Sequence, residues 1–230
     1  MDIVKVNWSG GKDSTCALSL HLNKGHKVKA VCYIPMFTES IPLISRSHFK
    51  WIMKTKKHFE DEGAEIHIVT GMTYWDYVTR VTTRGKYKGK IFGFPSYITG
   101  HCNFRTYSKI KAIRECDVCD YDYEDIGIAY DEHKRKSQLT DKKRSILNEL
   151  KITESQAQRY CYENGILSPH YTMGHRRDGC ALCPHKKKDE RFEWFQDYPE
   201  ALPLLIELQN IVKEQRPDRP PLREYKYFIE

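Results

Sequence analysis

The stretch Ser9–Ser14 carries the clearest chemistry in the sequence and follows the apolar run Val4–Trp8 directly. Two adjacent glycines allow a close backbone approach to a ligand, and two serines offer hydroxyl groups. A lysine adds positive charge, and a helix that begins here would direct its N–H groups at an anion. The stretch predicts a polyphosphate-binding loop, whose nucleotide-binding residues would be Ser9, Gly10, Gly11, Lys12, Asp13 and Ser14.

The spacing of this loop separates it from two common phosphate-binding motifs. Neither G-x-x-x-x-G-K-[ST] nor G-x-G-x-x-G is present in Ser9–Ser14. We therefore expect neither a Walker A loop nor a dinucleotide fingerprint. The alternative without a ligand is a simple glycine turn capped by serine and aspartate.

The eight cysteines form a second group with possible chemistry. We interpret them as thiols or metal ligands, because a reducing cytosol disfavours structural disulfides. Cys180-x-x-Cys183 and Cys116-x-x-Cys119 each allow two sulfurs to face one ion, so the four together could bind structural zinc. A group on apolar or helical stretches is expected to serve packing only, namely Cys16, Cys32 and Cys161.

Cys102 stands apart from these pairs because it precedes an expected helix. In an open α/β fold, we expect it at the edge of the sheet where ligands bind, close to the phosphate loop. As a free thiol, it could carry sulfur, with its pKa lowered by the adjacent helix N-terminus.

The elements that must position these residues alternate between β and α. Periodicity predicts strands at Val4–Trp8, Val28–Ile34, Glu65–Val69 and Asp125–Tyr130, with helices at Ser14–Leu22, Phe49–Phe59, Tyr74–Val81 and Phe104–Arg114. The order predicts an α/β fold, with a Rossmann-like parallel sheet and helices on both faces. Ligands would bind beyond the carboxyl ends of the strands.

The chain is predicted to comprise a nucleotide-binding domain, residues 1–150, and a mostly helical C-terminal module, residues 151–230. Thr153-x-x-Gln156 is a capping box that opens a helix ending near Gly165. The basic, glycine-rich segment Arg84–Pro95 is expected to be a mobile loop and a possible active-site flap.

The net charge of +7 and the pI of about 8.9 favour anionic partners. Nucleotide phosphate accounts for part of this bias, and a nucleic acid such as tRNA or DNA is a further possible partner. Neither an N-terminal signal pattern nor an apolar run of membrane-spanning length is found, so we expect a cytoplasmic protein without a membrane partner.

The sequence resembles the PP-loop superfamily of adenine nucleotide α-hydrolases, and within it the phosphoadenylyl-sulfate (PAPS) reductase-like family. Two residues depart from the family pattern, Ala129 and His133, where Arg and Ser are usual. Those reductases also carry a catalytic cysteine near the C-terminus, whereas no cysteine follows Cys183. The matching segments are Ser9–Ser14, Cys102–Ile113, Ile126–Arg135 and Asn164–Pro184.

The resemblance implies ATP and Mg²⁺ as ligands, with the ion near Asp13, and an enzyme that adenylates an acceptor or transfers sulfur. Its catalytic residues would be Lys12, Asp13 and Cys102. It also implies a possible [4Fe-4S] cluster on Cys102, Cys180 and Cys183, with His101 as a candidate fourth ligand, while zinc remains the alternative. Reduction of PAPS or adenylyl sulfate is a second interpretation. A third is a nucleotide-sensing or nucleic-acid-binding component of a larger assembly with reduced turnover.

Two acidic residues complete the candidates. Asp131 and Glu132 follow the last predicted strand, where their carboxylates could hold Mg²⁺ or act as a base. A solvated loop is the alternative.

Overall fold

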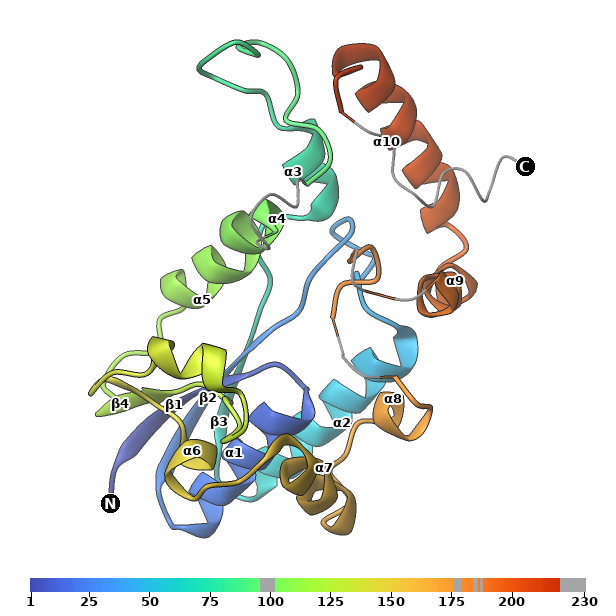
Figure 1. The fold of residues 1–230 in the computed structure, drawn as a ribbon. Coiled ribbons are helices and arrows are strands. Elements are labelled where there is room, and N and C mark those ends of the chain that lie inside the picture. Colours follow the sequence, from blue (N-terminus) through green and yellow to red (C-terminus); the bar gives the residue numbers. More distant parts are fainter. Residues whose placement is uncertain (96–101, 176–178, 184–185, 187, 220–230) are drawn as a thin grey trace. The chain divides into compact units, whose positions relative to one another are not determined.

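A computed structural model describes residues 1–95, 102–175, 179–183, 186 and 188–219 of the chain (Figure 1). A π-helical turn, Thr106–Ile110, joins helix α4 (Asn103–Arg105) to helix α5 (Lys111–Glu115), and a 3₁₀ turn spans His133–Gln138. The strands are β1 Ile3–Trp8, β2 Lys27–Tyr33, β3 Glu65–Val69, β4 Tyr123–Asp125 and β5 Lys143–Arg144. The helices are α1 Lys12–Asn23, α2 Arg46–Asp61, α3 Tyr74–Thr79, α4 Asn103–Arg105, α5 Lys111–Glu115, α6 Ile146–Glu149, α7 Glu154–Glu163, α8 Pro169–Thr172, α9 Lys188–Asp197 and α10 Ala201–Gln215.

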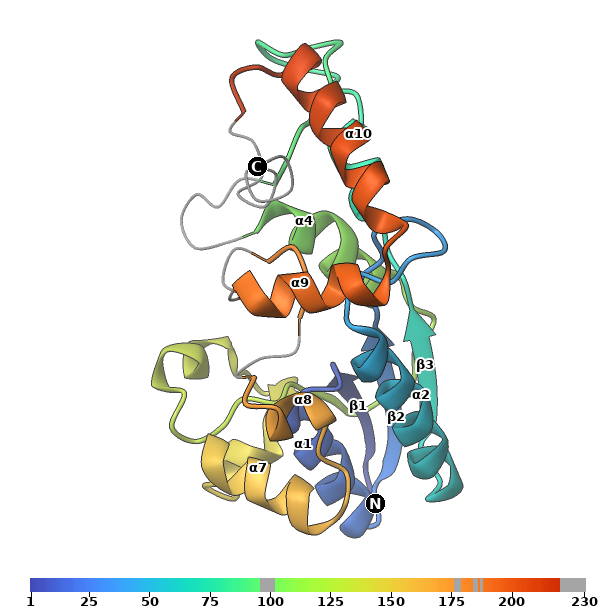
Figure 2. The same ribbon diagram turned by 90° about the vertical axis from the view of Figure 1, so that its right-hand side faces the viewer.

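The five strands form one parallel sheet in the order β3-β2-β1-β4-β5. The chain first builds outward from β1 through β2 to β3, and it later returns to the other side of β1 with β4. Figure 2 shows β1, β2 and β3 running in the same direction, with α2 alongside. The order therefore reverses between β1 and β4, and ligands of open α/β sheets bind at such a reversal.

The centre of the sheet is apolar because β1 is covered on both faces. Val4 and Val6 are fully buried, and Trp8 packs edge-on against Phe59 of α2 at a ring distance of 5.9 Å. The predicted parallel α/β architecture, with surrounding helices and a mostly helical C-terminal part, is confirmed.

The predicted strand Asp125–Tyr130 is wrong in extent, because β4 ends at Asp125. Ile128 and Ala129 are fully buried without strand pairing. Gly127 lies against the first turn of α1, so the chain leaves the sheet here while its apolar side chains stay covered. Burial on all sides produced the same apolar pattern as a strand would.

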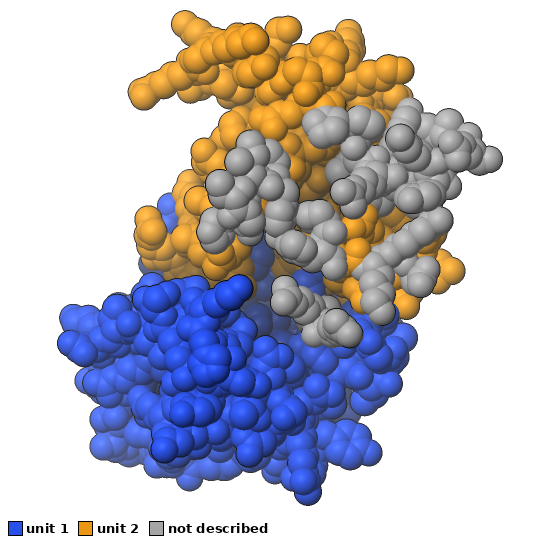
Figure 3. Space-filling model, in the orientation of Figure 1, with its two compact units in different colours: residues 1–34, 46–69, 115–179 blue, residues 35–45, 70–114, 180–230 orange. Residues whose placement is uncertain are grey.

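Two compact units divide the chain, and Figure 3 colours them separately. Unit 1 consists of residues 1–34, 46–69 and 115–179, and unit 2 of residues 35–45, 70–114 and 180–230. These boundaries differ from the predicted division at residue 150. The helix α7 lies on the predicted C-terminal side of that boundary, yet it packs against α1 in unit 1.

Unit 2 has its own core of aromatic and aliphatic side chains. Trp194 is fully buried and packs edge-on against Phe37 at a ring distance of 5.4 Å, and its indole N–H donates to the Pro42 carbonyl at 2.8 Å. Trp194 of α9 therefore has a packing role in unit 2. Among the described residues, none of the helices is long and apolar enough to cross a membrane.

Candidate functional site

The predicted phosphate loop lies between β1 and α1, at the carboxyl end of the central strand. Its backbone turns back on itself through Ser14, whose hydroxyl accepts from the Ser9 N–H and donates to the Gly11 carbonyl, both at 3.1 Å. Gly10 has φ of +74°, a conformation that favours glycine. Gly11 is the N-cap of α1 and provides no side chain to cap it. The loop therefore presents backbone N–H groups at the start of a twelve-residue helix.

Lys12 lies at the centre of a small group of carboxylates. Its amine contacts both oxygens of Asp13 at 2.9 Å and Oε2 of Glu154 at 3.2 Å. Burial lowers the pKa of Lys12, but the two carboxylates outweigh it, so the pKa stands above its ordinary value. The amine is therefore protonated at neutral pH.

The same carboxylates are suited to a divalent cation. Burial raises the pKa of Asp13, Lys12 only partly counteracts this, and the charges of Glu154 and Glu132 raise it further. Like charges gathered around a buried carboxyl favour a proton or a cation there, and oxygen ligands of this kind are those that Mg²⁺ prefers. Asp13, Glu132 and Glu154 are the side chains that could hold this ion.

His48 supports the loop from α2. A Cβ on Gly10 would lie 2.9 Å from Cε1 of His48, so the ring approaches the bare glycine backbone. The ring stacks on Trp51 at 5.7 Å, and its Nδ1 is 3.1 Å from the Ser168 hydroxyl. Neither periodicity nor a motif indicates this role of His48.

The start of α1 is also braced from the C-terminal side of unit 1. The Lys12 N–H donates to the Tyr171 hydroxyl at 3.2 Å, and the Cys161 thiol donates to the Lys12 carbonyl at 3.2 Å. Cys16, Cys32 and Cys161 are fully buried, as expected for packing residues, and Cys161 has this hydrogen bond in addition.

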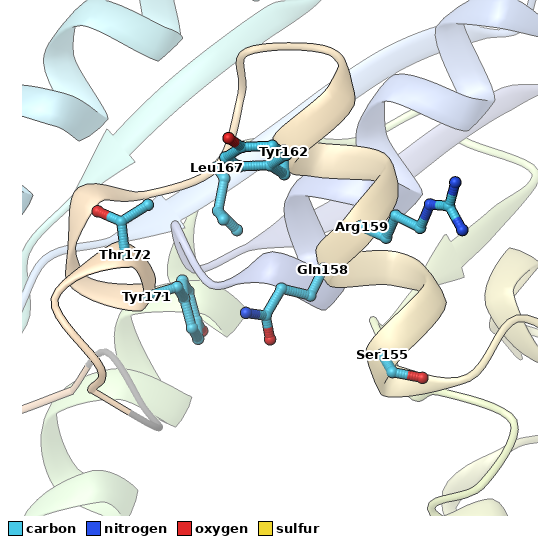
Figure 4. A pocket seen from close by; sticks show the side chains of 7 residues that line it. All are labelled: Ser155, Gln158, Arg159, Tyr162, Leu167, Tyr171 and Thr172. Carbon is cyan, nitrogen blue, oxygen red and sulfur yellow. The ribbon is translucent and has the colours of Figure 1, made fainter.

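A surface hollow of about 490 Å³ borders this support (Figure 4). Tyr171 is one of its lining residues and also contacts the loop backbone. Tyr171 therefore links the hollow to the phosphate loop. Its lining residues are Ser155, Gln158, Arg159, Tyr162, Leu167, Tyr171 and Thr172.

The two predicted acidic candidates after β4 have partners of different kinds. Asp131 accepts a hydrogen bond from the Glu154 N–H at 2.9 Å and thereby holds the start of α7. Glu132 accepts from the Ala129 N–H at 3.2 Å and pairs with Arg135 at 2.9 Å. Asp131 has a structural contact, whereas Glu132 also influences Asp13 electrostatically.

Glu154 is a site residue that the sequence did not single out. The predicted capping box is confirmed, because Thr153 and Gln156 exchange their hydrogen bonds at the start of α7. This cap places Glu154 at the first position of α7, from which it reaches Lys12. A carboxylate at that position is ordinary for a helix start, so the sequence held no signal for its second role.

Unit 2 contains the three cysteines predicted as metal ligands. Cys102 directly precedes α4, and a turn joins Cys180 to Cys183, whose N–H donates to the Cys180 carbonyl at 3.0 Å. The thiols lie close enough for the charge of each to affect the pKa of another. The structure brings these three residues together, and metal ligation by them stays a prediction. His101, the candidate fourth ligand, lies outside the described residues.

Burial dominates the acidity of these thiols. It raises the pKa of Cys180 to about 12, and the charges of Cys183 and Cys102 add to the effect. Burial also raises the pKa of Cys102, although the backbone N–H groups of Arg105 and Phe104 partly offset it. The expected net lowering of the Cys102 pKa at the helix start is therefore wrong, because desolvation exceeds the effect of the N–H groups.

Two tyrosines border the thiols in unit 2. Burial, followed by the charge of Cys102, raises the pKa of both Tyr74 and Tyr77. The Tyr77 side chain is fully buried, and its hydroxyl has no hydrogen-bond partner among the described residues. The phenol is an available donor next to the sulfur site, and no sequence motif pointed to it.

The other cysteine pair, Cys116 and Cys119, belongs to unit 1. Cys119 is exposed, its thiol donates weakly to Asp120 at 3.6 Å, and its carbonyl accepts from Lys29 at 2.9 Å. A zinc ion shared by both Cys-x-x-Cys pairs stays a prediction.

Comparison with known proteins adds little to this description. No protein-family model matches the chain, and no curated protein matches it. The chain is similar to a 4-thiouridine synthetase solved in complex with RNA and bound ATP, at 15% identity and a TM-score of 0.40. The similarity covers 90% of this chain and 53% of that one, so this chain spans about half of that protein's length. Support for a function comes from the sites themselves.

Proposed function

We propose that this protein is an ATP-using enzyme of the PP-loop class, which activates an acceptor as an adenylate and then transfers sulfur to it. The observation that carries the proposal is the Ser9–Ser14 loop at the reversal of strand order, with its glycine backbone, helix start and protonated Lys12. These features together suit a nucleotide triphosphate.

In the first step, an acceptor oxygen attacks the α-phosphate of ATP. A bond forms between this oxygen and phosphorus, the bond from the α-phosphate to the β-phosphate breaks, and pyrophosphate leaves. Lys12 and the N–H groups of the loop would bind the phosphates and stabilise their negative charge. Asp13, with Glu132 and Glu154 nearby, would hold Mg²⁺, which would supply positive charge to offset the charge of the phosphates.

In the second step, a sulfur nucleophile forms a bond to the activated carbon, and AMP leaves with the acceptor oxygen. Cys102, Cys180 and Cys183 are the candidate sulfur site. The resemblance of Cys102–Ile113 and Asn164–Pro184 to superfamily members that hold iron–sulfur clusters through cysteines at comparable places supports a cluster at these residues, with zinc as the alternative. Cys102, Cys180 and Cys183 would hold the cluster, which would supply the sulfur chemistry of this step.

Nucleotide binding is tested by calorimetry with MgATP on the wild type and on Lys12→Met. We expect affinity to fall at least about tenfold in Lys12→Met, because a buried charged hydrogen-bond donor is lost. Lys24→Met is the matched control, since Lys24 is exposed at the other end of α1. Equal affinities of the three proteins, with unchanged circular dichroism, would contradict the phosphate-binding role of Lys12.

Turnover is tested by pyrophosphate release from ATP in the presence of bulk tRNA or DNA as acceptor. Incorporation of ³⁵S into the same acceptor would report the second step. MgATP binding without pyrophosphate release from any acceptor would favour the alternative, a nucleotide sensor.

The cysteine site is tested by anaerobic purification with analysis of iron, sulfide and zinc. We expect about four irons per chain, lost in Cys102→Ala and retained in Cys119→Ala. One zinc that depends on Cys119 and not on Cys102 would contradict the cluster and leave ATP binding untouched.

A further inference from the structure

The positive charge of the chain is concentrated in one stretch of unit 2. Residues 77–114 contain nine of the 38 lysines and arginines and none of the 31 aspartates and glutamates. The rest of the chain has 29 basic and 31 acidic residues, a net charge of −2 against +9 for the stretch. The basic bias of the protein is thus a local property and not a general one.

Much of this charge is carried by a closed loop after α3, residues 80–93, which we call the basic hairpin. An antiparallel bridge joins Val81 to Ile91, and the Thr82 N–H donates to the Lys90 carbonyl at 2.8 Å. Figure 1 shows this segment extending beyond α3. The predicted loop at Arg84–Pro95 therefore has internal hydrogen bonds.

The charges of the stretch are available to a partner. Six of its basic residues are exposed and form no ion pair with a carboxylate in the described part of the chain. The exposed residues are Arg84, Lys86, Lys88, Lys90, Arg105 and Arg114. Cations that are not paired with a carboxylate retain their full charge for an external anion.

The basic hairpin is held in place by the residues that follow α10. Arg216, itself buried, donates to the carbonyl groups of Ile91 at 3.0 Å and Phe92 at 2.9 Å. Its guanidinium stacks 3.9 Å from the Tyr87 ring centroid and pairs with Asp218 at 2.8 Å. The hairpin thus has anchors at its tip and its base, which reduces the entropy lost when a partner binds.

A second guanidinium joins the hairpin to the helical segment 103–115. Arg80 lies 4.5 Å from the Phe92 ring and 4.1 Å from the Tyr107 ring. Tyr107 is 37% exposed, so its ring remains accessible beside the charges. The basic surface therefore includes an aromatic face.

The composition of this surface identifies its partner by class. Ile91 and Phe94 are buried, and Val81 is the exposed large apolar side chain of the hairpin. The surface therefore offers few apolar side chains for insertion into a membrane. Exposed lysines and arginines that form no ion pair with a carboxylate suit phosphodiesters, and an exposed tyrosine beside a guanidinium suits an unstacked base. We propose that this surface of unit 2 binds single-stranded nucleic acid, independently of ATP.

Fluorescence anisotropy with labelled oligo-uridine and oligo-deoxythymidine of about 20 nucleotides, without ATP, tests the proposal on the full chain. The variant Lys86→Ala/Lys88→Ala/Lys90→Ala should bind at least about tenfold more weakly at low salt. Its slope of log affinity against log salt concentration should fall by about 2, since three phosphate contacts at about 0.7 each are removed.

The matched control is Lys50→Ala/Lys54→Ala/Lys57→Ala on α2 in unit 1, where three exposed lysines are replaced with the same change in net charge. We expect affinity within about twofold of wild type and an unchanged slope for this variant. The comparison of the two oligonucleotides assigns the source as RNA or DNA. Equal losses in both triple variants, tighter binding to duplex RNA, or binding to anionic vesicles in place of either oligonucleotide would overturn the proposal.

Discussion

At the scale of single residues, Gly10 has an unusual backbone conformation and is part of the proposed phosphate loop. Its φ of +74° penalises any side chain, and a Cβ there would meet His48 at 2.9 Å. We predict that Gly10→Ala costs about 1–2 kcal/mol of stability from the left-handed conformation, and that it also lowers MgATP affinity at least about tenfold because the loop shifts. Urea denaturation and calorimetry measure the two effects.

Gly25 provides the control for this prediction. It has φ of +75° with nothing within 4 Å of a Cβ, so Gly25→Ala should carry the same conformational cost and bind MgATP normally. Normal MgATP affinity in Gly10→Ala would show that the contact with His48 does not position the loop.

Tyr77 is the second residue with a measurable consequence. Its buried hydroxyl lacks a hydrogen-bond partner among the described residues, and desolvation without a partner costs stability. We predict that Tyr77→Phe stabilises the metal-free protein by about 1 kcal/mol in urea denaturation. A loss of stability would mean that the hydroxyl makes a favourable contact in solution.

The pH dependence of this difference follows from the direction of the pKa shift. Burial raises the pKa of Tyr77, so the unfolded phenol loses its proton from about pH 10 while the folded one keeps it. The unfolded state is then favoured as pH rises, and wild-type stability should fall above about pH 10. We expect the gap between wild type and Tyr77→Phe to widen there, and a constant gap would contradict the assignment.

At the scale of elements, the lack of a side chain at Gly127 allows the segment after β4 to lie close to the start of α1. A Cβ on Gly127 would lie 2.7 Å from the Ser14 nitrogen, a backbone atom that cannot rotate away. We predict that Gly127→Ala destabilises the protein by about 1–3 kcal/mol in urea denaturation. Gly179→Ala is the control, because nothing lies within 4 Å of its Cβ position.

The anchor of the basic hairpin is also a property of elements. Arg216 donates in two directions, to the carbonyls of Ile91 and Phe92 and to Asp218, and a lysine cannot reproduce this planar geometry. We predict that Arg216→Lys speeds hydrogen exchange in residues 81–92 about tenfold. Arg159→Lys changes an exposed pair with Glu163 and should leave these amides unaffected.

The sequence patterns predicted the secondary-structure elements more successfully than they predicted the contacts between distant residues. The run Val4–Trp8, the loop Ser9–Ser14 and the capping box at Thr153 are local, and each is found where expected. Glu154 and His48 contact the loop only because the chain folds. Glu154, for example, is 142 residues away from its partner Lys12 in the sequence. Such long-range contacts leave no periodicity for a single sequence to show.

At the scale of the whole molecule, the division into two units also depends on long-range contacts that local sequence patterns do not reveal. A boundary at residue 150 follows the loss of strand patterns, which is a local signal. The structural boundary instead follows packing, and unit 2 draws on residues 35–45, 70–114 and 180–230. The net charge of the chain is also a poor guide to local charge, because the total of +7 does not show that residues 77–114 alone carry +9.

The three-segment construction of unit 2 has a consequence for how the chain acquires its structure. Leu43 accepts from the Ala181 N–H, Pro42 from Trp194, and Ile91 from Arg216, over separations of 125 residues or more. By contrast, β1 pairs with β2 from Ile3–Lys27 to Trp8–Cys32, only 24 residues apart. Because distant contacts form slowly, pulse-labelled refolding should show β1 and β2 protected before residues 81–92. On the ribosome, the core of unit 2 cannot be completed until α9 and α10 have emerged, so its aromatic side chains lack their packing partners until then.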